Sequence, residues 1–307
     1  MNDISMIKLS FIISVFNSEK YVRKMLSSLL NQTDRRFCVI VCDDGSTDSS
    51  FDVLKTFCID FDKYNIPYQL IRKDNGGVSS AVNAMLPLVK TDYFISCDSD
   101  DWYDCNVVEE FYCLLEKVKY FSLAAMSVRF FRENGQLKRI QSFSVEDENI
   151  NLFERFVDAK SIPCFTGIFI YNLRVFEESN GSRRIFNSRY GQNWQLILPI
   201  VKDHTILLLN NVFYNYLSRY ESLSHLRNTD KEYELLYGYS QILDNVLGKL
   251  GCEELRTRKK IEFNTKLCNV CFKSKKRTAF FKHYPLAKKS FKLFIKKVVL
   301  IMMIWKK

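Results

Sequence analysis

Residues 91–102, T-D-Y-F-I-S-C-D-S-D-D-W, decide the expected fold. Residues 93–97 form a short apolar run rich in aromatic and β-branched types, which is the composition of a strand buried on both faces. Three carboxylates follow at once, those of Asp98, Asp100 and Asp101. Burying three carboxylates at the end of a strand is costly unless a positive charge lies between them.

The acidic triplet has two interpretations. In an open α/β sheet, ligands bind at the carboxyl ends of the strands. An Asp-x-Asp motif at that place would hold a hard divalent cation, Mg²⁺ or Mn²⁺, which prefers oxygen ligands and commonly bridges to phosphate. Alternatively, the triplet is an acidic N-cap cluster on a solvated turn before the helix that follows Trp102. The neighbouring segments decide between the two.

The composition is that of a globular protein in a reducing compartment. With 307 residues, 47% hydrophobic and 26% charged, the chain can form one large domain, or one large and one small. Cys268 and Cys271 form an isolated pair with no second pair or histidine at metal spacing, which argues against zinc. We find no signal peptide and no apolar run of about 18 residues, and expect a cytoplasmic protein. Four further cysteines lie in or beside apolar runs, as buried thiols do: Cys38, Cys42, Cys58 and Cys97.

The net charge of +10 is unevenly distributed. Residues 226–307 contain 20 Lys and Arg against 7 Asp and Glu, whereas residues 1–225 contain 25 against 28. Within residues 256–307 the balance is 17 basic residues against the single acid Glu262. We therefore predict an α/β domain over 1–225 and a basic helical extension over 226–307.

Strands alternate with amphipathic helices in the first hundred residues. Helical spacing predicts helices over 21–31 and 78–89, and Thr47 is expected to cap a helix between them with Asp48 in its first turn. This alternation is typical of right-handed βαβ units, and thus of a Rossmann-like, mostly parallel sheet with helices on both faces. The expected strands are Leu9–Val15, 37–42, Tyr68–Arg72 and 93–97.

The polar and glycine-bearing residues follow the strands directly. Because the carboxyl ends of parallel strands meet at one rim, these residues should meet there too. Neither G-x-G-x-x-G after the first strand nor G-x-x-x-x-G-K-[ST] occurs, which disfavours dinucleotide cofactors and P-loop chemistry. The residues expected at the rim are Phe16, Asn17, Asp43, Asp44, Asn75, Gly76, Gly77, Asp98 and Asp100.

The rest of the large domain gives weaker signals. We expect a helix over 107–120, a strand pair over 124–132 and 138–145 around Asn134-Gly135, a helix after 189–195, and a strand over 206–216.

Five segments together resemble one known family, the family-2 glycosyltransferases with the GT-A fold. Their order and spacing both match, and the resemblance covers about the first third of the chain. The segments are S-F-I-I-S-V-F-N-S-E-K-Y (10–21), L-N-Q-T (30–33), V-C-D-D-G-S-T-D (41–48), D-N-G-G-V-S-S-A-V-N-A (74–84) and D-Y-F-I-S-C-D-S-D-D-W (92–102).

The resemblance implies a nucleotide-sugar donor bound across the rim. Phe16 stands where the family usually has a tyrosine that stacks on the base, and Ser14 would face the ribose. Asp44, with Asp43 beside it, matches the carboxylate that accepts from the imide N–H of the base, which suits uracil or thymine. The alternatives are a helix-capping staple for Phe16 and a turn aspartate for Asp44, a role better suited to Asp48. The loop residues Asn75, Gly76 and Gly77 complete the expected donor site.

The resemblance also implies a metal and further ligands. Asp98 and Asp100 match the family's Asp-x-Asp, in which the second carboxylate binds Mn²⁺ or Mg²⁺ and the first reaches the ribose or the metal; Asp101 stands in reserve. Such a metal would neutralise charge on the leaving diphosphate. The late stretch Y-x-x-R-x-x-S-x-S, residues 216–224, also resembles the family, so Arg219 could meet the diphosphate and His225 could add a metal ligand.

The expected general base is where this chain departs from the family. Inverting transfer to an acceptor hydroxyl needs a base, usually an Asp in an Asp/Glu pair at the start of a helix. Here Gln192 and Asn193 occupy that segment, with Asn193 at the base position, and neither amide can take a proton. The base is therefore elsewhere or dispensable. Carboxylates nearby in sequence are Glu177, Glu178 and Asp203.

The tail, Lys288 to Lys307, combines lysines with an apolar run and Trp305. It is too short to span a bilayer but suits an interfacial helix on an anionic membrane. The alternative is a terminal core helix whose lysines extend to solvent. Under the first interpretation, the protein lies at the inner face of the plasma membrane and acts on a lipid-linked or glycan acceptor of envelope polysaccharide synthesis. We expect no nucleic-acid partner.

Two other classes of function remain open at this point. A metal-dependent nucleotidyltransferase is disfavoured because no glycine-rich phosphate loop follows the first strand. A catalytically degenerate nucleotide-sugar-binding module is compatible with the amide pair at Gln192 and Asn193.

Overall fold

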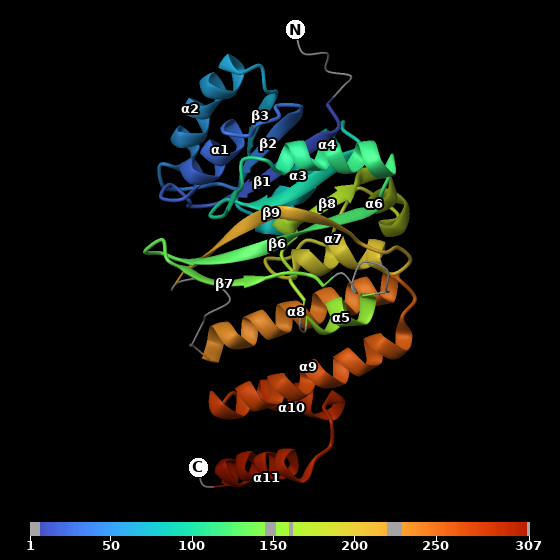
Figure 1. Ribbon diagram of the computed structural model, residues 1–307. Helices are drawn as coiled ribbons and strands as arrows, with labels where there is room; N and C mark the ends of the chain where they lie inside the picture. Colours follow the sequence, from blue (N-terminus) through green and yellow to red (C-terminus); the bar gives the residue numbers. More distant parts are fainter. Residues whose placement is uncertain (1–6, 145–151, 160–161, 220–228, 306–307) are drawn as a thin grey trace. The chain divides into compact units, whose positions relative to one another are not determined.

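The computed structural model describes residues 7–144, 152–159, 162–219 and 229–305 (Figure 1). The chain divides into two compact units, 1–219 and 220–307. The first is an α/β unit and the second is helical.

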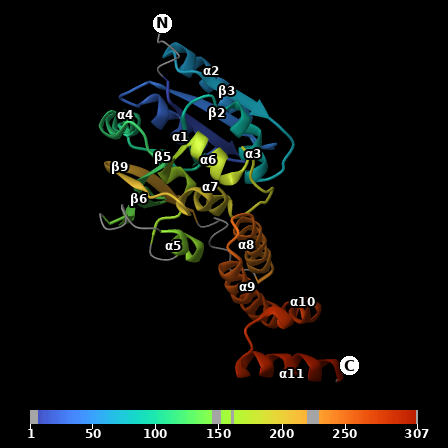
Figure 2. The same cartoon turned by 90° about the vertical axis from the view of Figure 1, so that its right-hand side faces the viewer.

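The predicted strands of the first hundred residues are confirmed, and β2 and β4 extend one residue further, into Asp43 and Asp98. β3, β2, β1 and β4 lie in this order and pair in parallel, with β2 and β3 side by side in both cartoons (Figure 2). The elements are β1 Leu9–Val15, α1 Val22–Leu30, β2 Phe37–Asp43, α2 Ser50–Lys63, β3 Tyr68–Arg72, α3 Val78–Met85 and β4 Tyr93–Asp98.

The strand order defines where a ligand should bind. The chain moves outward from β1 to β3 and then returns past β1 to β4. With right-handed crossovers, α3 therefore covers the opposite face of the sheet from α1 and α2. β1 is the point at which the direction reverses, and the crevice outside the carboxyl ends of its neighbours is the usual ligand site of such sheets.

The second half of the unit extends the sheet with mixed pairing. The described strands follow the order β3-β2-β1-β4-β8-β6-β9-β5, with β7 pairing only with β6. β8 is antiparallel to β4 and β6, whereas β6 and β9 are parallel. The added elements are β5 Trp102–Tyr103, α4 Val107–Val118, β6 Leu123–Arg132, β7 Leu137–Gln141, α5 Phe153–Asp158, β8 Phe169–Asn172, α6 Leu173–Asn180, α7 Gln192–Val201 and β9 Leu207–Ser218.

Three local predictions are corrected. The helix after β2 begins at Ser50 with Ser49 as its N-cap, so Asp48 precedes it, and the Thr47 hydroxyl expected to cap it donates instead to Asn17 Oδ1 at 3.3 Å. The helix predicted over 78–89 ends at Met85 and continues as a 3₁₀ turn, Leu86–Leu88, which contains a proline. The strand predicted over 138–145 is β7, which ends at Gln141, and residue 145 lies outside the described residues.

The core of the sheet is dry and aromatic where it supports the rim. Phe11 of β1 is fully buried and packs edge-on against Phe37 and Tyr103, with ring centroids 5.4 Å away in each case. The buried hydroxyls of Ser10 and Thr91 hydrogen-bond to each other at 2.6 Å. These contacts join β1 to β2, to β5 and to the residues just before β4.

The second unit is made of helices that share a small core. α8 and α9 pack along each other, and Leu293 and Leu300 of α11 pack with Cys268 and Cys271 of α9. Both thiols are free and buried, and burial raises the pKa of each to about 11. Among the described helices, none is long and apolar enough to cross a bilayer. The elements are α8 Thr229–Lys249, α9 Glu253–Lys273, α10 Arg277–His283 and α11 Phe291–Trp305.

A buried histidine joins three of these helices. The Nδ1–H of His283 donates to Asn264 Oδ1 at 2.8 Å, which leaves Nε2 to accept from the Tyr233 hydroxyl at 3.0 Å. Burial, and secondarily the charge of Lys282, lowers the pKa of His283. The neutral ring is therefore the form that the fold stabilises.

We predict that this helical unit loses stability in mild acid. The unfolded chain binds the His283 proton more tightly, so the contribution is complete above the ordinary histidine pKa of about 6.5 and is lost as the pH falls below it, toward the lowered pKa of the folded state. Amide hydrogen exchange in α9 and α10, corrected for intrinsic rates, should show less protection below about pH 6. His283→Gln should flatten this pH dependence. A parallel loss of protection in both proteins would contradict the assignment.

Candidate functional site

Three strand ends form the floor of the site. In the parallel register, Ser14 of β1 lies opposite Cys42 of β2 and Asp98 of β4, and the next residue of β1 lies opposite Asp43. The structure thus brings the expected acidic residues of β2 and β4 to one rim, on either side of β1. Ser14 lies between them and is partly buried.

Asp98 is the residue whose ionisation the site disturbs most clearly. Burial, and secondarily the charge of Asp100, raises the pKa of Asp98 to about 7, against the opposing effects of Gln192 and Arg219. Gln192 Nε2 donates to Asp98 Oδ1 at 3.2 Å. A cation placed beside this carboxylate would relieve both causes of the shift.

Asp100 is paired with Arg219, the residue predicted to contact the diphosphate. Arg219 Nη2 lies 2.6 Å from Asp100 Oδ2, and its guanidinium also lies 5.0 Å from the centroid of the Tyr21 ring. Burial raises the pKa of Asp100, and the charge of Arg219 opposes that shift. The buried Nε of Arg219 has no hydrogen-bond partner. Arg219 therefore reaches the acidic pair and carries a donor that is still free for a ligand.

Asp101 has a different role from its neighbours. It is fully buried, accepts from the Tyr214 hydroxyl, and accepts from the backbone N–H of Leu217 at 2.7 Å. Burial, with the charges of Asp100 and Asp98, raises its pKa well above the ordinary range. Both oxygens are thus used to attach β9 to the turn after β4, which leaves Asp98 and Asp100 as the pair available to a ligand.

Asp44 closes the glycine loop that was expected to bind the donor. Its Oδ1 lies 2.7 Å from Lys73 Nζ, and the backbone N–H groups of Gly76 and Gly77 donate to its carboxylate at 2.7 to 3.2 Å. Gly45 must be glycine here, since its φ is +76° and a Cβ would lie 2.8 Å from the backbone nitrogen of Asn75.

Asp43 and Asp44 are each neutralised by a cation at the end of β3. Asp43 Oδ2 lies 3.0 Å from Arg72 Nε, and these two residues are also partners in the strand register. Sequence reasoning missed Arg72 and Lys73 as site residues. The signal was present, because two consecutive basic residues end a strand next to one that ends in two aspartates.

The Phe16 side chain is exposed to solvent and does not pack into the core. Its side chain is 48% exposed, which does not fit a helix-capping staple, and the next residue, Asn17, adopts the left-handed conformation with φ of 47°. Asn17 Oδ1 accepts from the amide of Thr47 and so connects the turns after β1 and β2. Asp48 meets the predicted turn role, since its carboxylate accepts from the amides of Ser50 and Glu19.

The two amide side chains at the start of α7, Gln192 and Asn193, have different partners. Gln192 reaches Asp98, whereas the amide of Asn193 donates to the carbonyl of Cys164 at 2.5 Å. Gln192 is 7% exposed and its Oε1 is buried without a hydrogen-bond partner. The residue that touches the acidic pair is thus Gln192, which sequence reasoning had named but not assigned, and not Asn193.

The carboxylates considered as alternative bases lie elsewhere. Glu177 is paired with Arg183 and Glu178 with Arg174 on the surface of α6, at 2.7 and 2.8 Å. Asp203 is exposed beyond the far end of α7, about ten residues and so roughly 15 Å from Gln192 along the helix.

The donor set at the rim fits a hard cation, although the described residues hold no cluster of three His, Cys, Asp or Glu side chains arranged as a metal site. Asp98 and Asp100 are buried enough to have raised pKa values, and Gln192 Oε1 is a buried carbonyl oxygen without a partner. All are oxygen ligands, which Mg²⁺ and Mn²⁺ prefer. His225, the other predicted ligand, lies outside the described residues.

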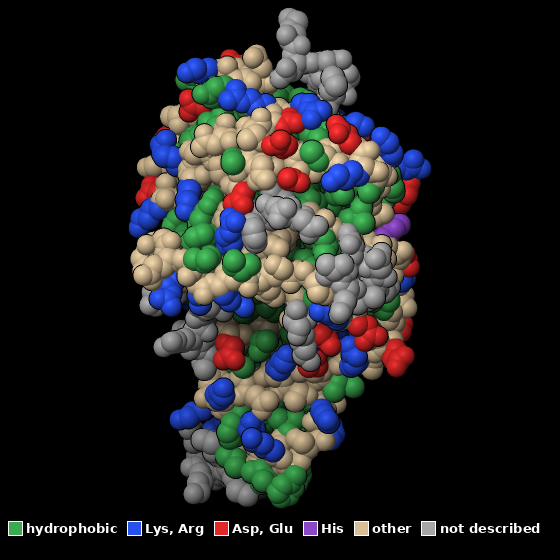
Figure 3. Space-filling model, in the orientation of Figure 1, with side chains coloured by type: hydrophobic (Ala, Val, Ile, Leu, Met, Phe, Trp, Pro, Cys, Tyr) green, Lys and Arg blue, Asp and Glu red, His purple; other side chains and the backbone are tan. Residues whose placement is uncertain are grey.

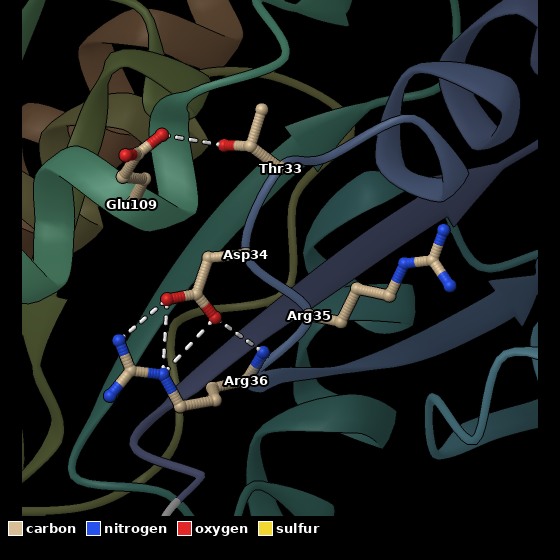
Figure 4. A pocket seen from close by; sticks show the side chains of 5 residues that line it. All are labelled: Thr33, Asp34, Arg35, Arg36 and Glu109. Atoms are coloured by element: carbon tan, nitrogen blue, oxygen red, sulfur yellow. Dashed lines mark hydrogen bonds and ion pairs between the residues drawn. The ribbon is translucent and has the colours of Figure 1, made fainter.

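A shallow pocket lies beside the amino end of β2, whereas the acidic rim lies at the carboxyl ends of the strands (Figure 4). It is lined by the loop before β2 and by Glu109 of α4. Arg36 pairs with Asp34 at 2.6 Å, and the Thr33 hydroxyl donates to Glu109 at 2.8 Å. Four of its five lining side chains thus pair with one another, and it is not our candidate site.

In open α/β sheets, ligands bind outside the carboxyl ends of the strands at the switch point, and here that place has an acidic, oxygen-rich rim. The sequence profile described as Glycosyl transferase family 2 matches residues 10–179, more than half of the 307. The chain belongs to glycosyl transferase family 2, as the resemblance indicated, and its fold is of the GT-A type.

Individual relatives and a solved structure are consistent with this family and fold. The chain is similar to glycosyltransferase GlyA of Streptococcus pneumoniae, with 27% identity over 71% of this chain and 32% of that protein. It is similar to teichoic acid poly(glycerol phosphate) polymerase of Staphylococcus epidermidis, with 28% identity over 75% of this chain and 31% of that protein. The chain thus spans about a third of these relatives. The solved S. aureus TarS 1–349 in complex with UDP-GlcNAc shares the fold, with a TM-score of 0.59, 14% identity, and coverage of 90% of this chain and 89% of that one.

We predict that Asp101→Ala destabilises the first unit more than Asp100→Ala does. Removing the Asp101 carboxylate leaves the buried Tyr214 hydroxyl and Leu217 N–H unpaired, which should lower the free energy of unfolding by about 2 kcal/mol or more. Removing Asp100 should cost less, because Arg219 can reach solvent and repulsion with Asp98 is relieved. Urea denaturation of the two variants measures this difference. Equal stability of Asp101→Ala and the unaltered protein would show that Asp101 is not an anchor.

Proposed function

We propose that this protein transfers a sugar from a nucleotide-sugar donor, UDP-linked, to a hydroxyl of a glycan or lipid-linked acceptor in the synthesis of an envelope polysaccharide. The observation that carries the proposal is the acidic pair at the switch point of the sheet, with Arg219 bound to Asp100 at 2.6 Å. A cation and a diphosphate need carboxylates and a guanidinium in the same place. The relative named as a teichoic acid polymerase supports the class of acceptor.

The donor would lie across the rim from β2 to β4. The exposed ring of Phe16 offers a face for the base, and Asp44 holds the glycine loop beneath it through Gly76 and Gly77. Because both oxygens of Asp44 are engaged, its contribution to recognition of the base imide would work through its remaining lone pairs. Asp43 would support this wall through Arg72.

The cation would be held by Asp98 and Asp100, with Gln192 Oε1 as a further oxygen. When bound, Mn²⁺ or Mg²⁺ would neutralise charge on the leaving diphosphate. Arg219 would then exchange its contact with Asp100 for one with phosphate, since its Nε already lacks a partner. In-line attack by the acceptor hydroxyl would invert the anomeric centre.

The acceptor proton is not removed by residue 192 or 193, since both are amides. This departure keeps a second candidate function open, that of a nucleotide-sugar-binding module without turnover. Release of free sugar or transferred product from a bound donor would distinguish the enzyme from the module.

The proposal predicts that Asp100→Ala loses metal-dependent donor binding while the fold persists. Titration calorimetry with UDP, in Mn²⁺ and in chelator, should show affinity falling about tenfold or more in Mn²⁺ and little change in chelator, because the lost carboxylate acts through the cation. Glu109→Ala, on α4 beside the loop before β2, is the matched control. Unchanged UDP affinity in Mn²⁺ would count decisively against the site.

A second comparison tests the amide pair. Gln192→Ala removes a hydrogen bond to a carboxylate, which is worth about 1.5 to 3 kcal/mol. If the transition state loses this stabilisation, turnover should become roughly 10- to 100-fold slower. Asn193→Ala should stay within about threefold, since its amide is turned to the Cys164 carbonyl. Initial rates of donor consumption give both values. The reverse order of effects would assign the site contact to Asn193.

A further inference from the structure

The last helix has an apolar face that nothing in the described residues covers. Positions separated by three and four residues along α11 lie on one face of a helix. Here that face holds large exposed side chains beside lysines (Figure 3). The exposed apolar residues, with their exposed fractions, are Phe291 (80%), Phe294 (51%), Ile295 (46%) and Val299 (37%).

The opposite face of α11 is already satisfied. Leu293 and Leu300, seven residues apart, are 3% and 1% exposed and pack into the core that α9 and α10 share. The two interpretations of the tail thus describe two faces of one helix. One face joins the unit, and the other is available to a partner. The side chains of residues 302–305, including that of Trp305, lie outside the described residues.

The charges around the exposed face are of one sign. Lys292, Lys296 and Lys297 lie on α11 between its two faces, and Lys288 and Lys289 precede it. Within the described residues none of the five has a carboxylate at ion-pair distance; Lys296 and Lys289 donate to amide or carbonyl oxygens. Earlier helices differ, since Arg256 pairs with Asp244 there and Lys266 with Glu262.

We propose that the exposed face of α11 docks on an anionic membrane surface, with Phe291, Phe294 and Ile295 in the interface and the flanking lysines at the headgroups. The helix lies along the surface, because 15 residues span about 22 Å and the hydrocarbon core is about 30 Å thick. A second copy of this chain is a poorer occupant, since it would bring the same uncompensated lysines against these. A nucleic acid would leave the apolar residues without a use.

Membrane docking deepens the proposed function, because it would hold the enzyme where lipid-linked acceptors are found. The biological role that we give to docking rests on the proposed function, but docking itself does not. Vesicle binding without any donor tests the docking face, and UDP titration tests the donor site, so failure of one is distinguishable from failure of the other.

The experiment is sedimentation with phosphatidylcholine vesicles, with and without phosphatidylglycerol, at low and high salt. The full chain should bind anionic vesicles, and high salt should weaken binding only in part, because burial is not screened. The triple variant Phe291→Ser, Phe294→Ser, Ile295→Ser should bind roughly tenfold or more weakly even at low salt. Replacing the same residues by leucine should preserve binding. Ile59→Ser, at a 75% exposed position on α2, is the matched control and should bind normally.

Several outcomes would overturn the proposal. Unchanged vesicle binding by the serine variant would show that the face does not insert. Equal binding of the full chain to neutral and anionic vesicles would remove the role of the lysines. A dimer of the full chain that the serine variant converts to a monomer, with no vesicle binding by either, would make a second copy the occupant. Circular dichroism of the serine variant should match the full chain, and loss of helix would show that these residues belong to the core.

Discussion

The structure depends on how the negative charges at the end of β4 are compensated. Asp101 is hydrogen-bonded by Tyr214 and the Leu217 amide, and Asp100 is paired with Arg219. Asp98 accepts from the amide of Gln192 and feels the charge of Arg219, yet burial and the charge of Asp100 raise its pKa to about 7. The protein thus folds with one carboxylate short of positive charge, beside a buried carbonyl oxygen and a buried guanidinium N–H that both lack partners. Such a deficit suits a cation and a phosphate.

The same principle organises the neighbouring strand. Asp43 ends β2 and Asp44 follows it, and their counter-charges come from Arg72 at the end of β3 and from Lys73 directly after it. The difference between the strands is informative. Charge at β2 is balanced within the chain, so these aspartates shape the glycine loop, whereas charge at β4 is balanced incompletely. We therefore infer different roles for two acidic pairs that look alike in sequence: Asp43 and Asp44 would build the wall of the site, and Asp98 and Asp100 would hold the ligand.

The sequence predicted the first four strands almost to the residue, because their apolar runs are bounded by polar turns and each hydrophobic period is unambiguous. It missed β5 and β8, which have two and four residues and depend on pairing with distant strands. It grouped Asp98, Asp100 and Asp101 but could not separate them, since the partner of Asp101 lies more than a hundred residues away on β9. It likewise left Gln192 and Asn193 equivalent, because helical phase at the first turn of α7 decides which amide faces Asp98.

A crystal structure with UDP and Mn²⁺ tests the central claim most directly. Our account predicts a cation bound by Asp100 and Asp98, with Arg219 released from Asp100 and contacting the diphosphate. The Asp101 contacts with Tyr214 and Leu217 should be unchanged. A nucleotide bound elsewhere, or an intact Asp100–Arg219 pair with no cation beside it at saturating Mn²⁺, would contradict the account.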